Sequence, residues 1–340
     1  MRAQVFHGPG DLRYEEVPVP EPGPGEVLLR IEAALTCGTD VKTLRRGHPV
    51  MLPKVPTVFG HEFAGTVAAV GPGVDGLRVG DRAVAANSAP CGTCPACARG
   101  QANLCDDLLF VNGAYAEYIA LPARLVACNV VTVPAAVPAA RVAFAEPVAC
   151  CLRAIDLAGL GRGDPVAILG HGPLGLLLGL LARAAGARVV LAGKAGPRLA
   201  VARGLGFEAC LDVGGAADPA GLIRLAAGGG VRCAIDATGR PEGWEQAVAA
   251  TDKGGTVIFF GGCAPGTSVR LDTRRVHYEE LRLFGAFHHT PAAIRRAVEL
   301  LSAGAIDPMP LVTDETGIEG VPEALARMSR GEALKTLVHP

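Results

Sequence analysis

Four cysteines in the first third of the chain have a spacing typical of metal ligands. They are Cys91, Cys94, Cys97 and Cys105, and the loop that carries them is rich in Gly, Pro and Ala. Such a loop has little apolar core, but four thiolates closing tetrahedrally on zinc would hold it together. A site of that kind has no open position for a substrate, so we expect a structural zinc. Iron–sulfur clusters also use four cysteines, but nothing else in the sequence indicates electron transfer.

Three short motifs carry residue types that suit a catalytic metal. The first is Cys37-Gly38-Thr39-Asp40, the second is Gly60–Gly65, which contains His61, and the third is Ala145-Glu146-Pro147. A catalytic zinc needs about three protein ligands and one open position. Cys37, His61 and a carboxylate would supply that set. The metal would act as a Lewis acid that stabilises negative charge on a substrate oxygen.

A glycine-rich turn predicts where a dinucleotide binds. Residues 170–175, Gly170-His171-Gly172-Pro173-Leu174-Gly175, fit G-x-G-x-x-G, and they follow an apolar run and open a long apolar segment. That context makes the motif specific. Gly170 would allow the tight turn, Gly172 would let a pyrophosphate approach the backbone, and Gly175 would let helix and strand pack closely. The free N–H groups at the helix N-terminus would bind the phosphates.

The next expected strand ends without an acidic residue. A carboxylate roughly 20 residues after the glycine turn usually binds the ribose hydroxyl of NAD. Here the strand ends in Gly193 and Lys194, with Arg198 close behind. Space and positive charge at this point favour the 2′-phosphate of NADP over NAD. The alternative is that Lys194 and Arg198 are ordinary solvated surface charges.

Further residues at strand ends belong to the expected cofactor and substrate sites. Open α/β sheets bind ligands at the carboxyl edge of their strands. This places Thr238-Gly239 and Gly261-Gly262 near the cofactor, and Phe287-His288-His289 follows the last strand, where it could line the substrate pocket. Neighbouring side chains diverge on most backbones, so we expect no metal site from the two adjacent histidines.

Two kinds of patterning divide the chain. The first 145 residues combine short β-branched runs with frequent Gly and Pro, which predicts a barrel-like β domain. From Pro165 onward, apolar strands alternate with helical stretches, which predicts a parallel, doubly wound α/β sheet. The expected domains are residues 1–148, completed by 288–340, and residues 149–287. The expected strands of the second domain are 166–169, 189–192, 209–213, 234–237, 257–260 and 281–284, and its helices include 174–185 and 198–205, with later helices at 292–302 and 321–328.

Composition narrows the class of protein. The chain has 340 residues, with 32 basic and 33 acidic ones and a net charge of -1. No basic block stands out, so we expect neither nucleic acid nor an anionic membrane as partner. The longest apolar run, Leu174–Ala182, is well short of the roughly 20 residues that span a bilayer. With no signal-peptide pattern at the N-terminus and an odd number of cysteines, eleven, we expect a soluble cytoplasmic protein.

Taken in order, these motifs resemble those of the zinc-containing medium-chain dehydrogenase/reductase family, in its sorbitol and threonine dehydrogenase branch. The resemblance runs over the whole chain. It implies a GroES-like catalytic domain, a Rossmann cofactor domain and a homodimer or homotetramer. It also implies that Cys37 and His61 bind the catalytic zinc, with Glu146 in the third position. Glu62 is a ligand in some polyol enzymes and could exchange with Glu146, and Thr39 would pass on the substrate proton.

One departure from the family concerns the proton relay. Many relatives carry a histidine five residues after the ligand cysteine, where this chain has Lys42. His48 is a candidate substitute, although a surface histidine is the simpler reading. Asp40 is expected to orient His61 or nearby backbone, as carboxylates around metal sites do.

The sequence therefore predicts an enzyme with two zinc ions per chain, and with NADP favoured over NAD. It would move a hydride between the cofactor and a secondary alcohol or polyol, or the matching ketone. Three alternatives stay open. They are an NAD-linked L-threonine 3-dehydrogenase, a zinc-free reductase of the same fold, and a cofactor-binding relative without catalysis.

Overall fold

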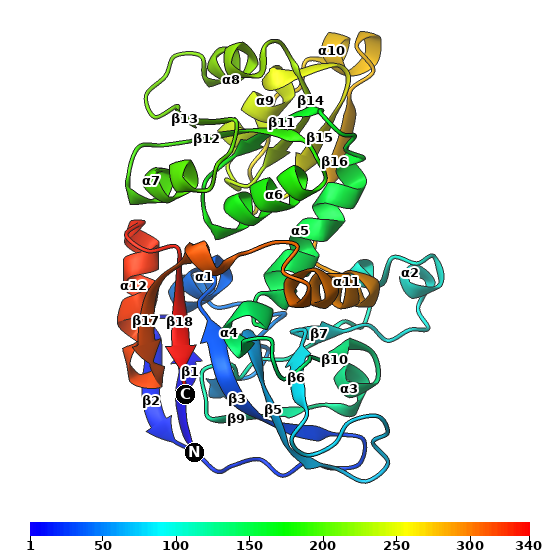
Figure 1. Cartoon of the computed structure of the whole chain (residues 1–340), viewed down its shortest axis with the longest axis vertical. Coiled ribbons are helices and arrows are strands. Elements are labelled where there is room, and N and C mark those ends of the chain that lie inside the picture. Colours follow the sequence, from blue (N-terminus) through cyan, green and yellow to red (C-terminus); the bar gives the residue numbers. More distant parts are fainter. The chain divides into compact units, whose positions relative to one another are not determined.

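The computed structural model describes residues 1–340, and the chain divides into two compact units. The first unit combines Met1–Ala149 with His289–Pro340, and the second is Cys150–His288. Figure 1 traces the chain from one terminus to the other. Helix α5 (Ala145–Ala158) contains the first of the two boundaries in the sequence. No helix combines the length and apolar character that crossing a membrane would need.

A seven-stranded sheet forms the centre of the first unit. Its long strands β3 (Val27–Leu35) and β5 (Glu62–Val70) pair antiparallel along their whole length, and apolar side chains of both are buried. Strand β18 (Lys335–His339), the last of the chain, pairs with β3 and so returns the C-terminus to this sheet. The remaining strands are β6 (Arg82–Ala85), β9 (Tyr118–Leu121), β10 (Val130–Thr132) and β17 (Val312–Gly317).

Two small sheets and several helices complete the first unit. The three-stranded sheet has the order β2-β1-β4, and β7 pairs with β8. The strands are β1 (Arg2–Gly8), β2 (Asp11–Glu16), β4 (Thr57–Val58), β7 (Ser88–Ala89) and β8 (Leu109–Phe110). The α-helices are α1 (Gly38–Arg46), α2 (Pro95–Ala98), α3 (Ala123–Asn129), α4 (Ala139–Val142), α11 (Pro291–Ser302) and α12 (Val321–Arg330). Short 3-10 turns lie at Ala102–Leu104, Met309–Leu311 and Ile318–Gly320.

The second unit is a six-stranded sheet in the order β13-β12-β11-β14-β15-β16, and all of its strand pairs are parallel. This confirms the predicted doubly wound fold. Figure 1 shows α6 on one side of the sheet and α8 and α9 on the other. Because helices cover both faces of the sheet, its strands bury apolar side chains on both sides. The strands are β11 (Pro165–Leu169), β12 (Arg188–Gly193), β13 (Ala209–Asp212), β14 (Val231–Asp236), β15 (Thr251–Phe259) and β16 (Arg282–Gly285). The helices are α6 (Pro173–Ala184), α7 (Pro197–Gly204), α8 (Pro219–Ala227), α9 (Pro241–Ala250) and α10 (Thr273–Tyr278).

Candidate functional site

Cys37, His61 and Glu62 form a compact group inside the first unit. One ligand atom from each lies within 4.8 Å of the others, and all three residues are buried. The pairing of β3 with β5 brings them together, since Leu35 is opposite Glu62 in the register. Cys37 lies two residues beyond Leu35, and His61 directly precedes Glu62. Sulfur, nitrogen and oxygen donors gathered in this way suit zinc.

Cys37 is also the N-cap of helix α1. The N–H of Thr39 donates to Sγ of Cys37 at 3.4 Å, and the N–H of Cys37 donates to Oδ2 of Asp40 at 2.9 Å. This reciprocal arrangement is a capping box in which a thiol takes the place of the usual hydroxyl. The helix start therefore fixes the position of the sulfur.

Asp40 connects the helix start to the histidine. Its Oδ1 lies 3.0 Å from Nδ1 of His61, and its Oδ2 accepts a 2.5 Å hydrogen bond from the hydroxyl of Tyr115. Burial alone would lower the pKa of His61, but the charge and hydrogen bond of Asp40 outweigh it and raise that pKa well above its usual value. Burial raises the pKa of Tyr115, and the neighbouring Asp40 raises it further. The expectation that Asp40 orients His61 agrees with this contact.

Gly60, which directly precedes His61, lies at a position that only glycine can occupy. Its φ is +90°, and a Cβ at this position would lie 2.7 Å from the ring of Tyr115. Both the backbone conformation and the close approach of the ring exclude a larger residue. Gly60 thus allows Tyr115 to reach Asp40 behind the histidine.

Lys335 is a buried partner of Glu62 that the sequence analysis missed. Its Nζ contacts Oε2 of Glu62 and donates to the carbonyl of Thr36 at 2.9 Å. Burial raises the pKa of Glu62, against the opposing effect of the lysine. Burial would lower the pKa of Lys335, but the charge of Glu62 outweighs it and raises that pKa. The other carboxylate oxygen, Oε1 of Glu62, is buried without a hydrogen-bond partner.

Glu146 lies outside the group of three. It is buried in α5, and its carboxylate lies within 4.8 Å of a ring nitrogen of His289. His289 is buried as well, with Nε2 3.0 Å from Oδ1 of Asn87 and 3.4 Å from Oγ of Ser88. Of the two candidate carboxylates, Glu62 is therefore the one grouped with Cys37 and His61.

The candidate relay residues lie at or near the surface. Thr39 is half-buried in the first turn of α1, and Lys42 is exposed one turn later. The ring of His48 is half-buried, and its Nδ1 accepts a 3.1 Å hydrogen bond from the N–H of Met51.

The four cysteines of the loop after β7 converge as a tetrahedral site requires. Their Sγ atoms lie within 4.8 Å of one another, and none is in a disulfide. The Sγ atoms of Cys94 and Cys105 are 3.9 Å apart. That agrees with the edge of about 3.8 Å that zinc–sulfur bonds of about 2.3 Å would give. Backbone N–H groups of the loop donate to Sγ of Cys91, Cys94 and Cys105.

The glycine turn of the second unit has the geometry that phosphate binding needs. A Cβ on Gly175 would lie 1.9 Å from the carbonyl oxygen of Gly170, so helix α6 packs directly on the turn. A Cβ on Gly172 would meet nothing within 4 Å, which leaves the backbone open to a ligand. Pro173 and Leu174 form the first turn of α6, whose leading N–H groups lack helical partners. These residues fit a dinucleotide pyrophosphate.

Two further turns meet at the same sheet edge. Gly239 and Gly262 approach closely, since a Cβ on Gly239 would lie 2.8 Å from the carbonyl oxygen of Gly262. Asp236 organises the first turn by accepting hydrogen bonds from the hydroxyl of Thr238 at 2.6 Å and the N–H of Gly239 at 3.1 Å. The sequence analysis placed Thr238, Gly239, Gly261 and Gly262 near the cofactor. It did not identify Asp236, because nothing in the local sequence distinguishes this carboxylate from any other residue at the end of a strand.

The residues chosen for NADP selectivity lie where β12 ends. Lys194 is exposed and Arg198 is half-buried in α7, where burial lowers the pKa of its guanidinium. The carboxylate of Asp212 also lies at this turn, but its Oδ1 accepts from the N–H groups of Ala195 and Gly214, each at 2.9 Å.

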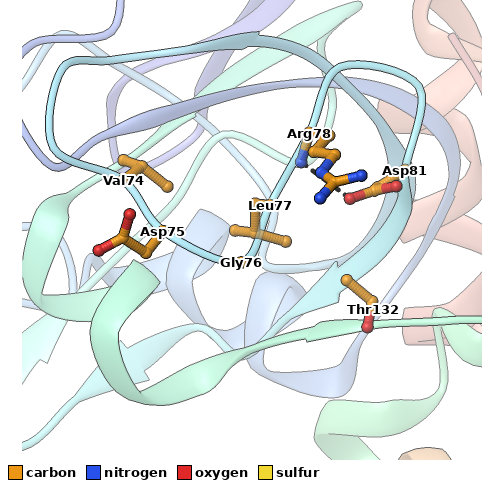
Figure 2. A pocket seen from close by; sticks show the side chains of 7 residues that line it. All are labelled: Val74, Asp75, Gly76, Leu77, Arg78, Asp81 and Thr132. Carbon is orange, nitrogen blue, oxygen red and sulfur yellow. Dashed lines mark hydrogen bonds between the residues drawn. The ribbon is translucent and has the colours of Figure 1, made fainter.

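A surface hollow of about 610 Å³ lies elsewhere in the first unit. Figure 2 shows it between the loop after β5 and strand β10, with Arg78 beside Asp81. None of the predicted site residues lines it. Its lining is Val74, Asp75, Gly76, Leu77, Arg78, Asp81 and Thr132.

Comparison with known proteins gives consistent matches. The model of the alcohol dehydrogenase GroES-like domain matches residues 23–134, and that of zinc-binding dehydrogenases matches residues 173–303. The sorbitol dehydrogenase of Ovis aries is 32% identical over 98% of this chain and 94% of its own length. The L-threonine 3-dehydrogenase of a Chelativorans species is 31% identical over 99% of this chain and 98% of its own. Among solved structures, a zinc-binding dehydrogenase from Sinorhizobium meliloti bound to NADP has a TM-score of 0.90 and 32% identity, covering 100% of this chain and 99% of that one.

Proposed function

The chain belongs to the zinc-binding alcohol dehydrogenase family, and from this premise we propose that Cys37, His61 and Glu62 hold its catalytic zinc. The enzyme transfers a hydride between a nicotinamide cofactor and a secondary alcohol or polyol, or the matching ketone. The observation that carries the assignment is the buried group of three, with Oε1 of Glu62 left without a partner. A zinc ion bound there supplies Lewis-acid stabilisation of negative charge on a substrate oxygen.

The surrounding residues have separate tasks in this proposal. Asp40 holds Nδ1 of His61, which leaves Nε2 for the metal. Lys335 holds one oxygen of Glu62 and leaves the other for the metal. Glu146 is the alternative carboxylate. The hydroxyl of Thr39, in the half-buried first turn of α1, would accept the substrate proton while passing its own proton on towards solvent.

We assign a second, structural zinc to Cys91, Cys94, Cys97 and Cys105. Support comes from the approach of their sulfur atoms and from the lack of disulfides. A site with four thiolates is closed to substrate, so its expected contribution is to the stability of the loop. The enzyme would thus carry two zinc ions per chain.

The nicotinamide cofactor is assigned to the sheet edge formed by the ends of β11, β12, β14 and β15. NADP is favoured over NAD because no carboxylate side chain stands at Gly193 while Lys194 and Arg198 supply positive charge. The related structure from S. meliloti was solved with NADP bound. In this proposal Gly172 and the start of α6 bind the pyrophosphate.

A homo-oligomer is the proposed assembly. Strand β16 forms one edge of the six-stranded sheet, and Phe284 in this strand is 39% exposed. Exposed edge strands with apolar side chains are sites of further strand pairing. We therefore favour a dimer that covers β16, and sedimentation of the purified protein would distinguish it from a tetramer.

The experiment that tests the function is a substrate screen with both cofactors. Polyols, simple secondary alcohols and L-threonine are each offered with NADP⁺ and with NAD⁺, and reduced cofactor is measured by its absorbance. We expect turnover of a polyol or secondary alcohol with NADP⁺. Because one relative is an L-threonine 3-dehydrogenase, the second candidate is oxidation of L-threonine with NAD⁺. If only this pair were turned over, the proposal of a polyol or secondary-alcohol substrate would be wrong.

A further inference from the structure

The turn after β12, residues 193–196, is held by two side chains from neighbouring strand ends. Nε2 of His171 lies 2.5 Å from the carbonyl oxygen of Lys194, and Oδ1 of Asp212 accepts from the N–H of Ala195 at 2.9 Å. A carbonyl only accepts hydrogen bonds, so His171 carries its proton on Nε2. His171 is the variable second residue of the glycine turn, and it thus connects the pyrophosphate loop to the turn that carries Lys194.

The ring of His171 also fills the space beside Gly193. A Cβ built on Gly193 would lie 2.1 Å from Cδ2 and 2.5 Å from Nε2 of His171. Real atoms do not approach so closely, so the observed position of the imidazole and any side chain at residue 193 exclude each other. The glycine is therefore required by the histidine and not by its own backbone conformation.

Residue 193 occupies the strand end at which dinucleotide-binding folds distinguish the two cofactors. A carboxylate there would bind the ribose hydroxyls of NAD and repel the 2′-phosphate of NADP. We propose that His171 determines cofactor specificity, because its ring excludes a carboxylate at residue 193 and its bond to Lys194 holds the cationic turn in place. This inference rests on the proposed dinucleotide site at this sheet edge.

The test is a double-mutant cycle with binding as its readout. Dissociation constants for NADPH and NADH are measured by fluorescence titration of the wild-type enzyme, His171→Ala, Gly193→Asp and the double variant. His171→Ala should weaken NADPH binding about threefold to tenfold, which corresponds to one lost hydrogen bond. Gly193→Asp alone should weaken both cofactors, because the aspartate and the ring compete for one space.

The double variant gives the decisive comparison. It should bind NADH at least about tenfold more tightly than Gly193→Asp does, while NADPH stays weak, so the two positions are coupled. Equal NADH affinity in Gly193→Asp and the double variant would overturn the inference. The wild-type ratio of NADPH to NADH affinity separately tests the proposed preference, so each idea can fail without the other.

A milder cycle covers the case in which Gly193→Asp does not fold. Gly193→Ala adds only the clashing Cβ, so it should displace His171 and weaken NADPH about as much as His171→Ala. Combining the two should add little. Full additivity would contradict the inference, and thermal midpoints report folding throughout. The control is His277→Ala, an exposed histidine that contacts Tyr278 in the same unit and should leave both affinities unchanged.

Discussion

Oδ1 of Asp40 lies 3.0 Å from Nδ1 of His61, while Oδ2 of the same carboxylate accepts the hydroxyl of Tyr115 and the N–H of Cys37. One buried side chain therefore positions both the histidine and the cysteine of the proposed zinc site. Metal-binding histidines commonly donate their second ring N–H to a carboxylate. The carboxylate fixes the orientation of the ring and makes the imidazole a stronger ligand.

Asp40→Asn should weaken the proposed catalytic site without removing a ligand. The amide keeps the size of the side chain but loses the charge that faces His61. We expect zinc affinity at this site to fall about tenfold to hundredfold, with a similar loss in kcat/KM. Zinc retained against a graded chelator series measures the first quantity. Asp11→Asn, in an exposed pair with Arg13, is the control. Unchanged zinc retention in Asp40→Asn would contradict the role given to Asp40.

In protein stripped of zinc by a chelator, Lys335→Met should destabilise the first unit, because it leaves the carboxylate of Glu62 buried without a cation. Breaking a buried pair in this way costs about 3–5 kcal/mol in the free energy of unfolding. Adding Glu62→Gln should recover part of the loss, since the remaining side chain is then neutral. Urea denaturation, monitored by circular dichroism, measures the free energy of unfolding of the single and the double variant. Arg330→Met removes exposed ion pairs and should change little; an equal loss in Lys335→Met and Arg330→Met would speak against the buried pair.

Cys97→Ser should remove one zinc ion and spare the other. The loop would then lack a fourth thiolate, so the zinc content should fall from two per chain to one and the thermal midpoint should drop. Turnover should persist below that midpoint, because the proposed catalytic ligands are untouched. Cys128→Ser changes a half-buried thiol of the same unit and serves as the control. Full zinc content in Cys97→Ser would refute the assignment of the loop.

Gly175→Ala and Gly172→Ala form a matched pair in the glycine turn. The first places a Cβ 1.9 Å from the carbonyl oxygen of Gly170, so the backbone must move. We expect it to destabilise the second unit by about 1–3 kcal/mol. The second places its Cβ in open space, so it should fold normally and bind NADPH at least about tenfold more weakly. If Gly172→Ala bound NADPH like the wild type, the pyrophosphate would not lie over that residue.

The sequence predicted the second unit well because its strands and helices have strong local patterns. Residues 166–169 were expected as a strand and β11 is Pro165–Leu169, while 174–185 were expected as a helix and α6 is Pro173–Ala184. Strand β15 was expected only from residue 257, but it starts at Thr251. The polar and glycine-containing start of this strand, Thr251–Gly255, has no apolar pattern to reveal it.

The sites were less predictable wherever they depend on register or on distant pairing. The motifs pointed to Cys37 and His61, but the grouping of Glu62 with them depends on the register that places Leu35 opposite Glu62. Lys335 stands in the last strand, next to apolar residues, and no local pattern connects it with Glu62. His171 occupies a variable position of its motif, so its contact with the turn after Gly193 needed the structure.

Zinc content and turnover of Cys37→Ser, measured on one preparation beside the wild type, test the central claim most directly. The variant should fold like the wild type, keep the structural zinc and lose the second ion, and its NADP⁺-linked oxidation of the best alcohol substrate should fall below detection. NADPH binding should survive, because the cofactor residues lie in the other unit. Full turnover by the variant, or two zinc ions still bound to it, would contradict a catalytic metal at Cys37, His61 and Glu62.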